Sequence, residues 1–358
     1  MNNRIHHLDA MRGTLMMLGV FYHSAKVFST SQDWIIIHPE STLLANFMIE
    51  VLHIFRMPAF FILSGYFAAL TLKRYGSAKF LKVRVTRIMI PFVVTALTLN
   101  SLQAYVLTQT GWVDFNLTTY LLDGNWVTHL WFLMNLVIYF LLYVAIHHLL
   151  KEKTDIILNT LNLLLSKVPF AAIMMFLLPI SIIAALAIGQ IYPVEHILKT
   201  SLLFNYMPFF FFGVLTYHHK TILAKFTDFP PLFSFLITVV AVMIAHYFAS
   251  LDAYIWYIVH VYFISIGMWF SASLCFHLFK KFTSYHSNIF RVLSEMSYTV
   301  YLFHHLLVIM IGLVLIHYGI GGTLGLILLI ISVAVIAVSI HLFVVSKVKI
   351  LSLLFNGK

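Results

Sequence analysis

The stretch LDAMRGTLMMLGVFYHSAKVF, residues 8–28, has the length and the apolar character of a membrane-spanning helix, yet it carries Asp9, Arg12 and His23. A spanning helix needs about 20 mostly apolar residues. Charged side chains inside a bilayer are costly, so those that persist there are usually functional. A secretory signal peptide would lack these internal charges and would end in a small-residue cleavage site, which is missing here. We therefore interpret this stretch as a retained first spanning helix.

The rest of the 358-residue chain is equally apolar, with 61% hydrophobic residues, 9% charged residues and a mean hydropathy of +0.96. These values lie outside the range of soluble globular domains. We predict an all-α, polytopic integral membrane protein of about ten transmembrane helices that forms one transmembrane domain over residues 1–358, with no soluble extracytoplasmic domain. The spans are expected at 8–28, 43–72, 88–108, 128–150, 168–189, 200–217, 232–250, 254–278, 293–316 and 323–345.

The basic residues predict the orientation of these spans. Eighteen of the 22 Lys and Arg residues fall on the side of the N terminus, and the loops on the other side are acidic, with Lys199 the one clear exception. This positive-inside pattern places both termini in the cytoplasm and suggests a bacterial inner membrane. The formal net charge of +10 is then explained by topology, so we expect membrane lipids and no nucleic acid as partners. The basic segments are 73–87, 151–167, 218–231, 279–292 and 346–358.

The polar residues of the first span share one face. Asp9 and Arg12 are three residues apart and can pair, either as a structural clamp or as part of a site. His23 follows Arg12 by eleven residues, which returns to nearly the same face about 16 Å further along the axis. Arg12 should then face the inner half of the membrane and His23 the outer half. Histidine is the usual general base, so His23 is the leading catalytic candidate.

The second expected span contains His53 and Arg56. Arg56 must find an anionic ligand or a structural partner such as Glu50, and both alternatives remain open. Pro58 should kink the helix.

Further along the same span, Ser64-Gly65 should allow a second helix to approach closely. After it, segment 73–87 holds six basic residues and ends in Arg84-Val85-Thr86-Arg87, which we expect in a loop. This segment either anchors to anionic lipids or captures phosphate, because guanidinium groups match phosphate oxygens.

Other polar residues complete the candidate list. These are His129 and Trp131 at the outer start of the fourth expected span, and Ser297, Tyr301, His304 and His305 in the ninth. The lone Cys275 is expected to serve packing only. No spacing of His, Cys or acidic residues predicts a metal site, and no nucleotide-binding or hydrolase motif occurs. The predicted substrate-binding residues are Arg56, His53, Ser64, Tyr66, His129, Trp131, Tyr301 and His304.

Taken in order, these segments resemble the membrane acyltransferase-3 superfamily, and especially its glucan biosynthesis protein C branch, the periplasmic glucan succinyltransferases. The most specific element is LDAMRG with His23 completing an Arg-x10-His spacing, followed by the R-x-x-R of Arg84 and Arg87. The other matching blocks are HIFRMPAFFILSGYF (53–67), HLWFL (129–133), YMPFFFFGVL (206–215) and SYTVYLFHH (297–305).

The resemblance implies an O-acyltransferase that moves an acyl group, succinyl or acetyl, from cytoplasmic acyl-CoA to a hydroxyl of an extracytoplasmic glucan or other carbohydrate. His23 matches the catalytic histidine of the family, with Asp9 and Arg12 beside it, and Arg12, Arg84 and Arg87 match donor-side arginines. Succinyl-CoA or acetyl-CoA would be a substrate, and no permanently bound cofactor is implied. A transporter or exporter of a small anion or polyol is the alternative, because buried Arg and His also line transport paths.

Overall fold

The computed structural model describes residues 6–31, 33–150, 153–191, 198–285 and 287–357. Arg4, Lys151, Glu195 and Lys358, which belong to the charge pattern, lie outside the described residues. Within these ranges the chain forms helices and no strand, as predicted. The helices are α1 (His6–Val27), α2 (Leu43–Tyr75), α3 (Ser77–Thr95), η1 (Ala96–Asn100), α4 (Ser101–Gln109), α5 (Leu117–Leu122), η2 (Thr128–Leu130), α6 (Trp131–Leu150), α7 (Lys153–Ser166), α8 (Phe170–Ala172), η3 (Ile173–Leu177), α9 (Leu178–Ile191), α10 (Thr200–His218), α11 (Lys220–Thr227), α12 (Pro231–Ala249), α13 (Tyr254–Thr283), α14 (Asn288–His317), α15 (Gly322–Ser339), η4 (Ile340–Val345) and α16 (Lys349–Asn356).

The length and composition of the helices indicate a multi-pass membrane protein. Eight helical segments of the described chain are long and apolar enough to cross a bilayer. The expected spans 8–28 and 200–217 also fold as helices, α1 and α10, but they fall outside this set because both carry more polar residues. The eight segments are Leu43–Tyr75, Ser77–Gln109, Thr128–Leu150, Phe170–Ile191, Pro231–Ala249, Tyr254–Thr283, Asn288–His317 and Gly322–Val345.

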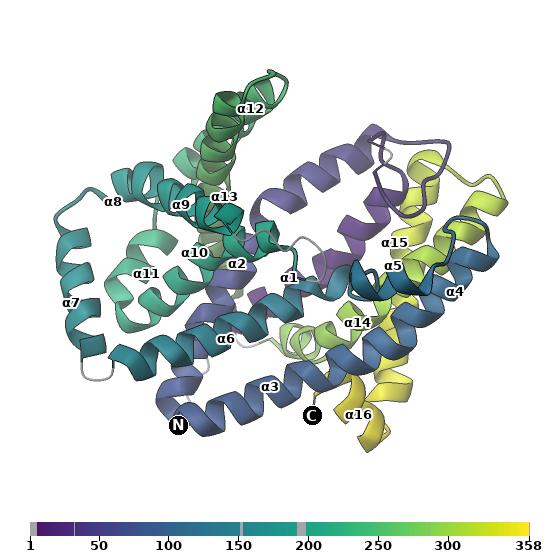
Figure 1. The fold of residues 1–358 in the computed structure, drawn as a ribbon, viewed down its shortest axis with the longest axis horizontal. Helices are drawn as coiled ribbons and strands as arrows, with labels where there is room; N and C mark the ends of the chain where they lie inside the picture. Colours follow the sequence, from purple (N-terminus) through teal and green to yellow (C-terminus); the bar gives the residue numbers. More distant parts are fainter. Residues whose placement is uncertain (1–5, 32, 151–152, 192–197, 286, 358) are drawn as a thin grey trace.

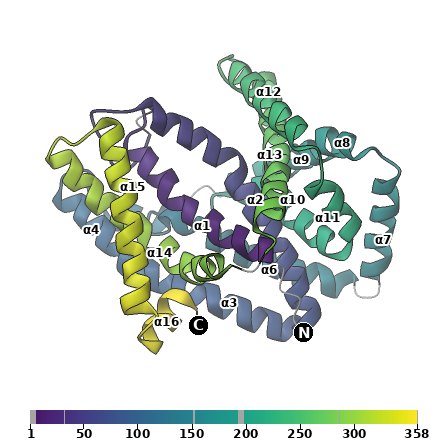
Figure 2. The same ribbon diagram turned by 180° about the vertical axis from the view of Figure 1, so that it is seen from behind.

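The first two helices lie in the middle of the bundle. α1 packs against α14 and α2, and α2 packs in turn against α10 and α13. Both views place α7 at one end of the molecule and α4 with α15 at the opposite end (Figures 1 and 2). The helix that carries Asp9, Arg12 and His23 is therefore packed between other helices of the bundle.

A reciprocal pair of glycines brings α2 and α10 together. A Cβ on Gly65 would overlap the carbonyl group of Phe210, and a Cβ on Gly213 would overlap that of Ile62. Both overlaps involve backbone atoms, so no side-chain rotation can relieve them. The close helix contact expected at Ser64-Gly65 is thus present.

The prediction of a basic loop over 73–87 is wrong. α2 continues to Tyr75, α3 begins at Ser77, and only Gly76 lies between them, with a φ of +73°. Lys and Arg are good helix formers, and their long side chains reach water while the helix stays partly buried. Arg84 and Arg87 are consequently held on a regular helix.

The segment between α1 and α2 is tied back onto α1. The amide of His38 donates to the carbonyl of Val27 at 2.8 Å, and Lys26 Nζ lies 3.1 Å from a carboxylate oxygen of Asp33. These contacts hold Trp34 over the C-terminal end of α1, where it reaches the site described below.

We expect the stabilising effect of Asp33 to disappear in acid. Hydrogen bonds from Ser31 and Lys26 lower the pKa of Asp33. Its contribution is therefore fully present above the unfolded-state pKa and is lost as the pH falls through the lowered folded-state value. The Asp33 side chain is 58% exposed, so solvent screening limits the effect to less than about 1 kcal/mol. Thermal unfolding of Asp33→Asn should show a small deficit at neutral pH and none in acid; an equal deficit at both would contradict this.

Candidate functional site

Polar side chains from α1, α2, α6 and α14 and from η2 surround a cavity of about 40 Å³. A space of this size holds a few water molecules or one small reacting group. We call it the histidine cavity. Its polar lining consists of His23, Arg56, His129, Trp131, Tyr301 and His304.

Four imidazole rings meet at this point. The His23 ring centroid lies 5.2 Å from that of His304 and 5.0 Å from that of His305. The His129 ring stacks on His305 at 4.6 Å. His23 is partly buried, whereas His129, His304 and His305 are buried.

Several nitrogen atoms around the cavity lack a hydrogen-bond partner. Within the described chain these are His23 Nδ1, Arg56 Nε, His129 Nε2 and His304 Nε2, all shielded from solvent. Buried polar atoms are nearly always paired in native structures. Four unpaired atoms facing one cavity from different helices indicate a place where a polar ligand completes the hydrogen bonding.

The tautomer of His304 follows from its partner. Its Nδ1 lies 2.6 Å from the carbonyl oxygen of Tyr301, and a carbonyl only accepts, so Nδ1 carries the proton. In the neutral ring, Nε2 is then an acceptor. Gly19 leaves the space beside it open, because a Cβ there would lie 3.4 Å from His304 Nε2 and 3.1 Å from Arg56 Nη1.

Arg56 keeps its charge available for a ligand. Its guanidinium lies 4.8 Å from the centre of the Tyr22 ring, and no carboxylate of the described chain pairs with it. Glu50, the structural partner considered above, instead lies 3.5 Å from His246. Of the two alternatives for Arg56, the geometry favours the anionic ligand.

Residues of the third spanning segment support the cavity from outside. Gln103 Oε1 lies 2.7 Å from His305 Nδ1, and Asn100 Nδ2 donates to the carbonyl of Trp126 at 2.7 Å, just before His129. A π-helical turn, η1, ends at Asn100 and separates α3 from α4, the helix that carries Gln103. Such turns recur at functional sites. Sequence reasoning missed Gln103 and Asn100, because an insertion of this kind shifts the helical register.

The segment that carries His129 is held in an uncommon conformation. Thr128 has a φ of +42°, and its Oγ1 lies 3.1 Å from His129 Nδ1. Tyr301 Oη donates to the carbonyl of His129 at 2.7 Å. Backbone strain of this kind usually persists where function requires it. Tyr301 therefore positions His129 as well as lining the cavity.

A second polar cluster forms nearer the start of α1. Arg12 lies 3.5 Å from Asp9, as its spacing predicted, and donates to Ser294 Oγ at 2.8 Å. The Arg12 guanidinium also lies 5.7 Å from the centre of the Phe67 ring, and Arg84 Nη2 is 3.3 Å from the carbonyl oxygen of Phe67. Phe67 thus brings Arg12 and Arg84 together, and we call these two residues the arginine pair.

The remaining candidates lie outside both clusters. Arg87 is exposed on α3, and His53 is exposed with its ring stacked on Tyr22 at 6.1 Å. Tyr66 accepts a hydrogen bond from Lys220 Nζ at 2.6 Å. Ser64, His53 and Tyr66 do not line the histidine cavity.

Trp34 and Tyr206 are additions that the sequence did not single out. Trp34 lies 6.0 Å from the His23 ring and 5.5 Å from that of His305, and Tyr206 stacks on Trp131 at 5.7 Å. Over the described residues, no group of three His, Cys, Asp or Glu side chains is placed to hold a metal ion.

Comparison with known proteins gives a match over nearly the whole chain. Residues 5–344 match the acyltransferase-3 family model, described as an acyltransferase domain. The chain is 28% identical over 377 residues to glucans biosynthesis protein C of Escherichia coli strain K12, covering 99% of this chain and 95% of that protein. The proteins of the same name from Escherichia coli O1:K1 and O139:H28 show the same identity and coverage. No solved structure matches the chain.

Proposed function

The chain belongs to the acyltransferase-3 family, and on this premise we propose that it moves a succinyl or acetyl group from cytoplasmic acyl-CoA to a hydroxyl of an extracytoplasmic glucan or related carbohydrate. The observation that carries this proposal is the histidine cavity, where unpaired nitrogen atoms of His23, Arg56 and His304 converge. An acyl transfer needs a base for the hydroxyl and a donor for the developing oxyanion, and these groups supply both.

In this proposal His23 is the general base. Its unpaired Nδ1 takes the proton of the acceptor hydroxyl, and the oxygen attacks the thioester carbonyl carbon. The carbon–sulfur bond then breaks, and the CoA thiolate leaves and is protonated. Direct transfer requires one base only, whereas a covalent acyl-histidine would add a second step.

Arg56 stabilises negative charge in the same space. Its unpaired Nε–H can donate to the oxyanion, or to the free carboxylate if the acyl group is succinyl. His304 Nε2 is an acceptor and can orient the acceptor hydroxyl toward His23. Ser64, His53 and Tyr66 have no role in this mechanism.

The arginine pair binds the donor. Arg12 and Arg84 meet at Phe67, and guanidinium groups match the phosphate oxygens of coenzyme A. Arg84 Nε is unpaired among the described residues, so a further hydrogen bond can form there. Arg87, exposed on the same helix, adds positive charge at the entrance.

We expect Arg84→Lys to raise the KM for acyl-CoA about tenfold with little change in kcat, because lysine keeps the charge but loses the planar fork. Steady-state kinetics of the purified variant measure this. Arg74→Lys is the matched control, since the Arg74 guanidinium packs on Tyr75, 5.2 Å from the centre of its ring. A lower kcat at an unchanged KM would place Arg84 outside donor binding.

Topology is part of the same proposal. α1 and α10 join the eight apolar segments to give about ten crossings in one transmembrane domain, with both termini in the cytoplasm of a bacterial inner membrane. The donor then reaches the arginine pair from the cytoplasm, and the carbohydrate reaches the histidine cavity from the other side.

The direct test uses the purified protein with succinyl-CoA or acetyl-CoA and glucan oligosaccharides. We expect free CoA thiol and acylated glucan, identified by mass, to appear in equal amounts and only when both substrates are present. Uptake of a small anion or polyol into vesicles without release of CoA would favour the transporter alternative and contradict the proposal.

A further inference from the structure

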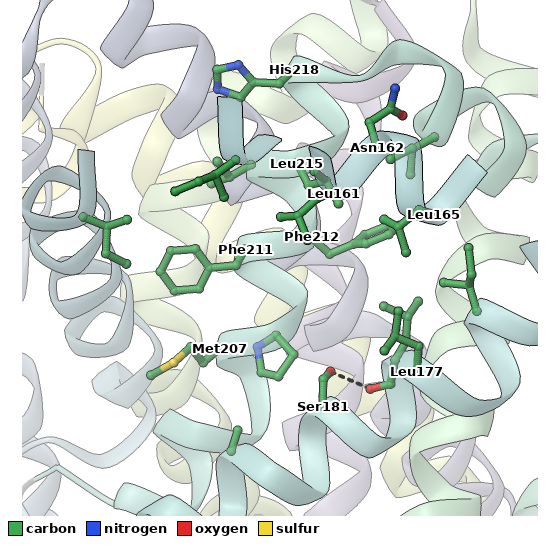
Figure 3. Close-up of a pocket in the computed structure, with 18 of the residues that line it drawn as sticks. Leu161, Asn162, Leu165, Leu177, Ser181, Met207, Phe211, Phe212, Leu215 and His218 are labelled. Atoms are coloured by element: carbon green, nitrogen blue, oxygen red, sulfur yellow. Dashed lines mark hydrogen bonds between the residues drawn. The ribbon is translucent and has the colours of Figure 1, made fainter. Parts of the chain in front are cut away.

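A cavity of about 910 Å³ lies away from the histidine cavity, between α6, α7, α9, α10 and α11. We call it the lateral groove. Phe211 and Leu215 of α10 and Leu161 and Leu165 of α7 point into it (Figure 3). Its volume lies in the range of about 300–1,000 Å³ that binds small molecules. Nothing in the proposed reaction uses this space.

The groove is apolar along most of its length and polar at one end. His218 and Asn162 lie at one end in the close-up, whereas Met207 lies toward the other (Figure 3). His147 and Lys225 also line the groove. Among the described residues that line it there is no Asp or Glu. A ligand that fills it must therefore be mostly apolar, and its polar part should not be cationic.

A second cavity of about 510 Å³ adjoins the groove and shares Ser166 and Lys225 with it. Lys167 also lines this second cavity. Its one acidic residue, Asp228, is already paired with Lys280 at 2.7 Å. Lys167 and Lys225 have no ion-pair partner in the described chain, so they leave a net positive charge in the cavity that adjoins the groove.

We propose that the lateral groove and the adjoining cavity together bind one anionic phospholipid of the membrane. The acyl chains occupy the apolar groove, and the phosphate lies between Lys167 and Lys225. A soluble anion would leave the groove unfilled, and a neutral lipid would leave both lysines without a counter-ion. An anionic amphiphile satisfies both parts.

This site is separate from the proposed reaction. One face of α10 lines the groove through Phe211 and Leu215, while Gly213 packs against α2, the helix that carries Arg56. The bound lipid would thus contact the helix behind the histidine cavity without entering it.

Native mass spectrometry of the purified full chain tests the proposal by comparing phosphatidylglycerol with phosphatidylcholine of identical acyl chains. We expect roughly tenfold tighter binding of phosphatidylglycerol. The double variant Lys167→Gln/Lys225→Gln should bind both lipids equally, while Lys281→Gln, an exposed lysine of α13 outside both cavities, should keep the preference.

A second variant tests the groove itself. Ala184 lines the groove and is exposed, so Ala184→Trp fills it without disturbing the core, and both lipids should then bind weakly. Thermal unfolding confirms that each variant is folded. Equal binding of the two lipids by the unaltered chain, a preference that survives in the double variant, or unchanged binding by Ala184→Trp would each overturn the proposal.

Discussion

Alanine at His23 is expected to lower acyl transfer by about 100- to 10,000-fold, the usual contribution of a general base. His23 is the partly buried member of the imidazole group, and its Nδ1 lacks a partner in the described chain. Removing the ring deletes the proton acceptor and leaves the hydroxyl a poor nucleophile. The helix itself should persist, because alanine is the best helix former.

The control for this prediction is His260→Ala, which removes a histidine of α13 whose Nδ1 lies 2.9 Å from the carbonyl of Ala245, outside the cavity. It should transfer acyl groups at nearly the unaltered rate. If His23→Ala is as active as the control, His23 is not the base. If only His304→Ala is inactive, His304 Nε2 is the base instead.

Alanine at Gly213 is expected to cost about 1–3 kcal/mol of stability or more, which is the usual range for overpacking a tight core. The added Cβ would overlap the backbone of Ile62, so α2 and α10 must move apart. Gly65→Ala should lower the stability by a similar amount, because its added Cβ would overlap the backbone of Phe210 in the same helix contact. Thermal unfolding in detergent measures both.

Gly267→Ala is the matched control, since it also adds one methyl group to a helical glycine. Its Cβ would lie 3.2 Å from Ile54 Cδ1 and 3.3 Å from Val242 Cγ2, which are side-chain methyl groups rather than backbone atoms. The stability of this variant should change little. Equal unfolding temperatures for Gly213→Ala and Gly267→Ala would contradict the tight α2–α10 contact.

Helical periodicity accounts for the part of the site that the sequence predicted. Asp9, Arg12 and His23 share a face of α1, and the structure places Arg12 beside Asp9 and His23 at the histidine cavity. Such patterns follow from 3.6 residues per turn and need no knowledge of the neighbouring helices. Polar residues in apolar spans were accordingly the most informative signal.

Residues whose position depends on a neighbouring helix could not be predicted. Gln103 reaches His305 only because η1 changes the register between α3 and α4. Tyr66, ten residues beyond Arg56 on α2, lies about 15 Å along the axis and meets Lys220 instead. Sequence alone does not tell which of two polar residues on one helix will meet a given cavity.

The prediction of a loop over 73–87 was wrong for a different reason. A run of basic residues suggested exposed backbone, yet only Gly76 breaks the helix there. A run of charged residues indicates that the ends of the side chains reach water. It does not indicate an irregular backbone, because long Lys and Arg side chains can reach water from a helix. Arg84 could not be placed beside Arg12 until both were known to lie on helices that meet at Phe67.

Sidedness is the most direct test of the central claim, that one membrane-embedded site takes its donor and its acceptor from opposite faces. The protein is reconstituted into sealed vesicles, glucan is enclosed, and acyl-CoA is added outside. Protein molecules inserted with their basic face on the outside of the vesicle should form acylated glucan inside and release free CoA thiol outside. Product that forms only when both substrates are on the same side would contradict the account.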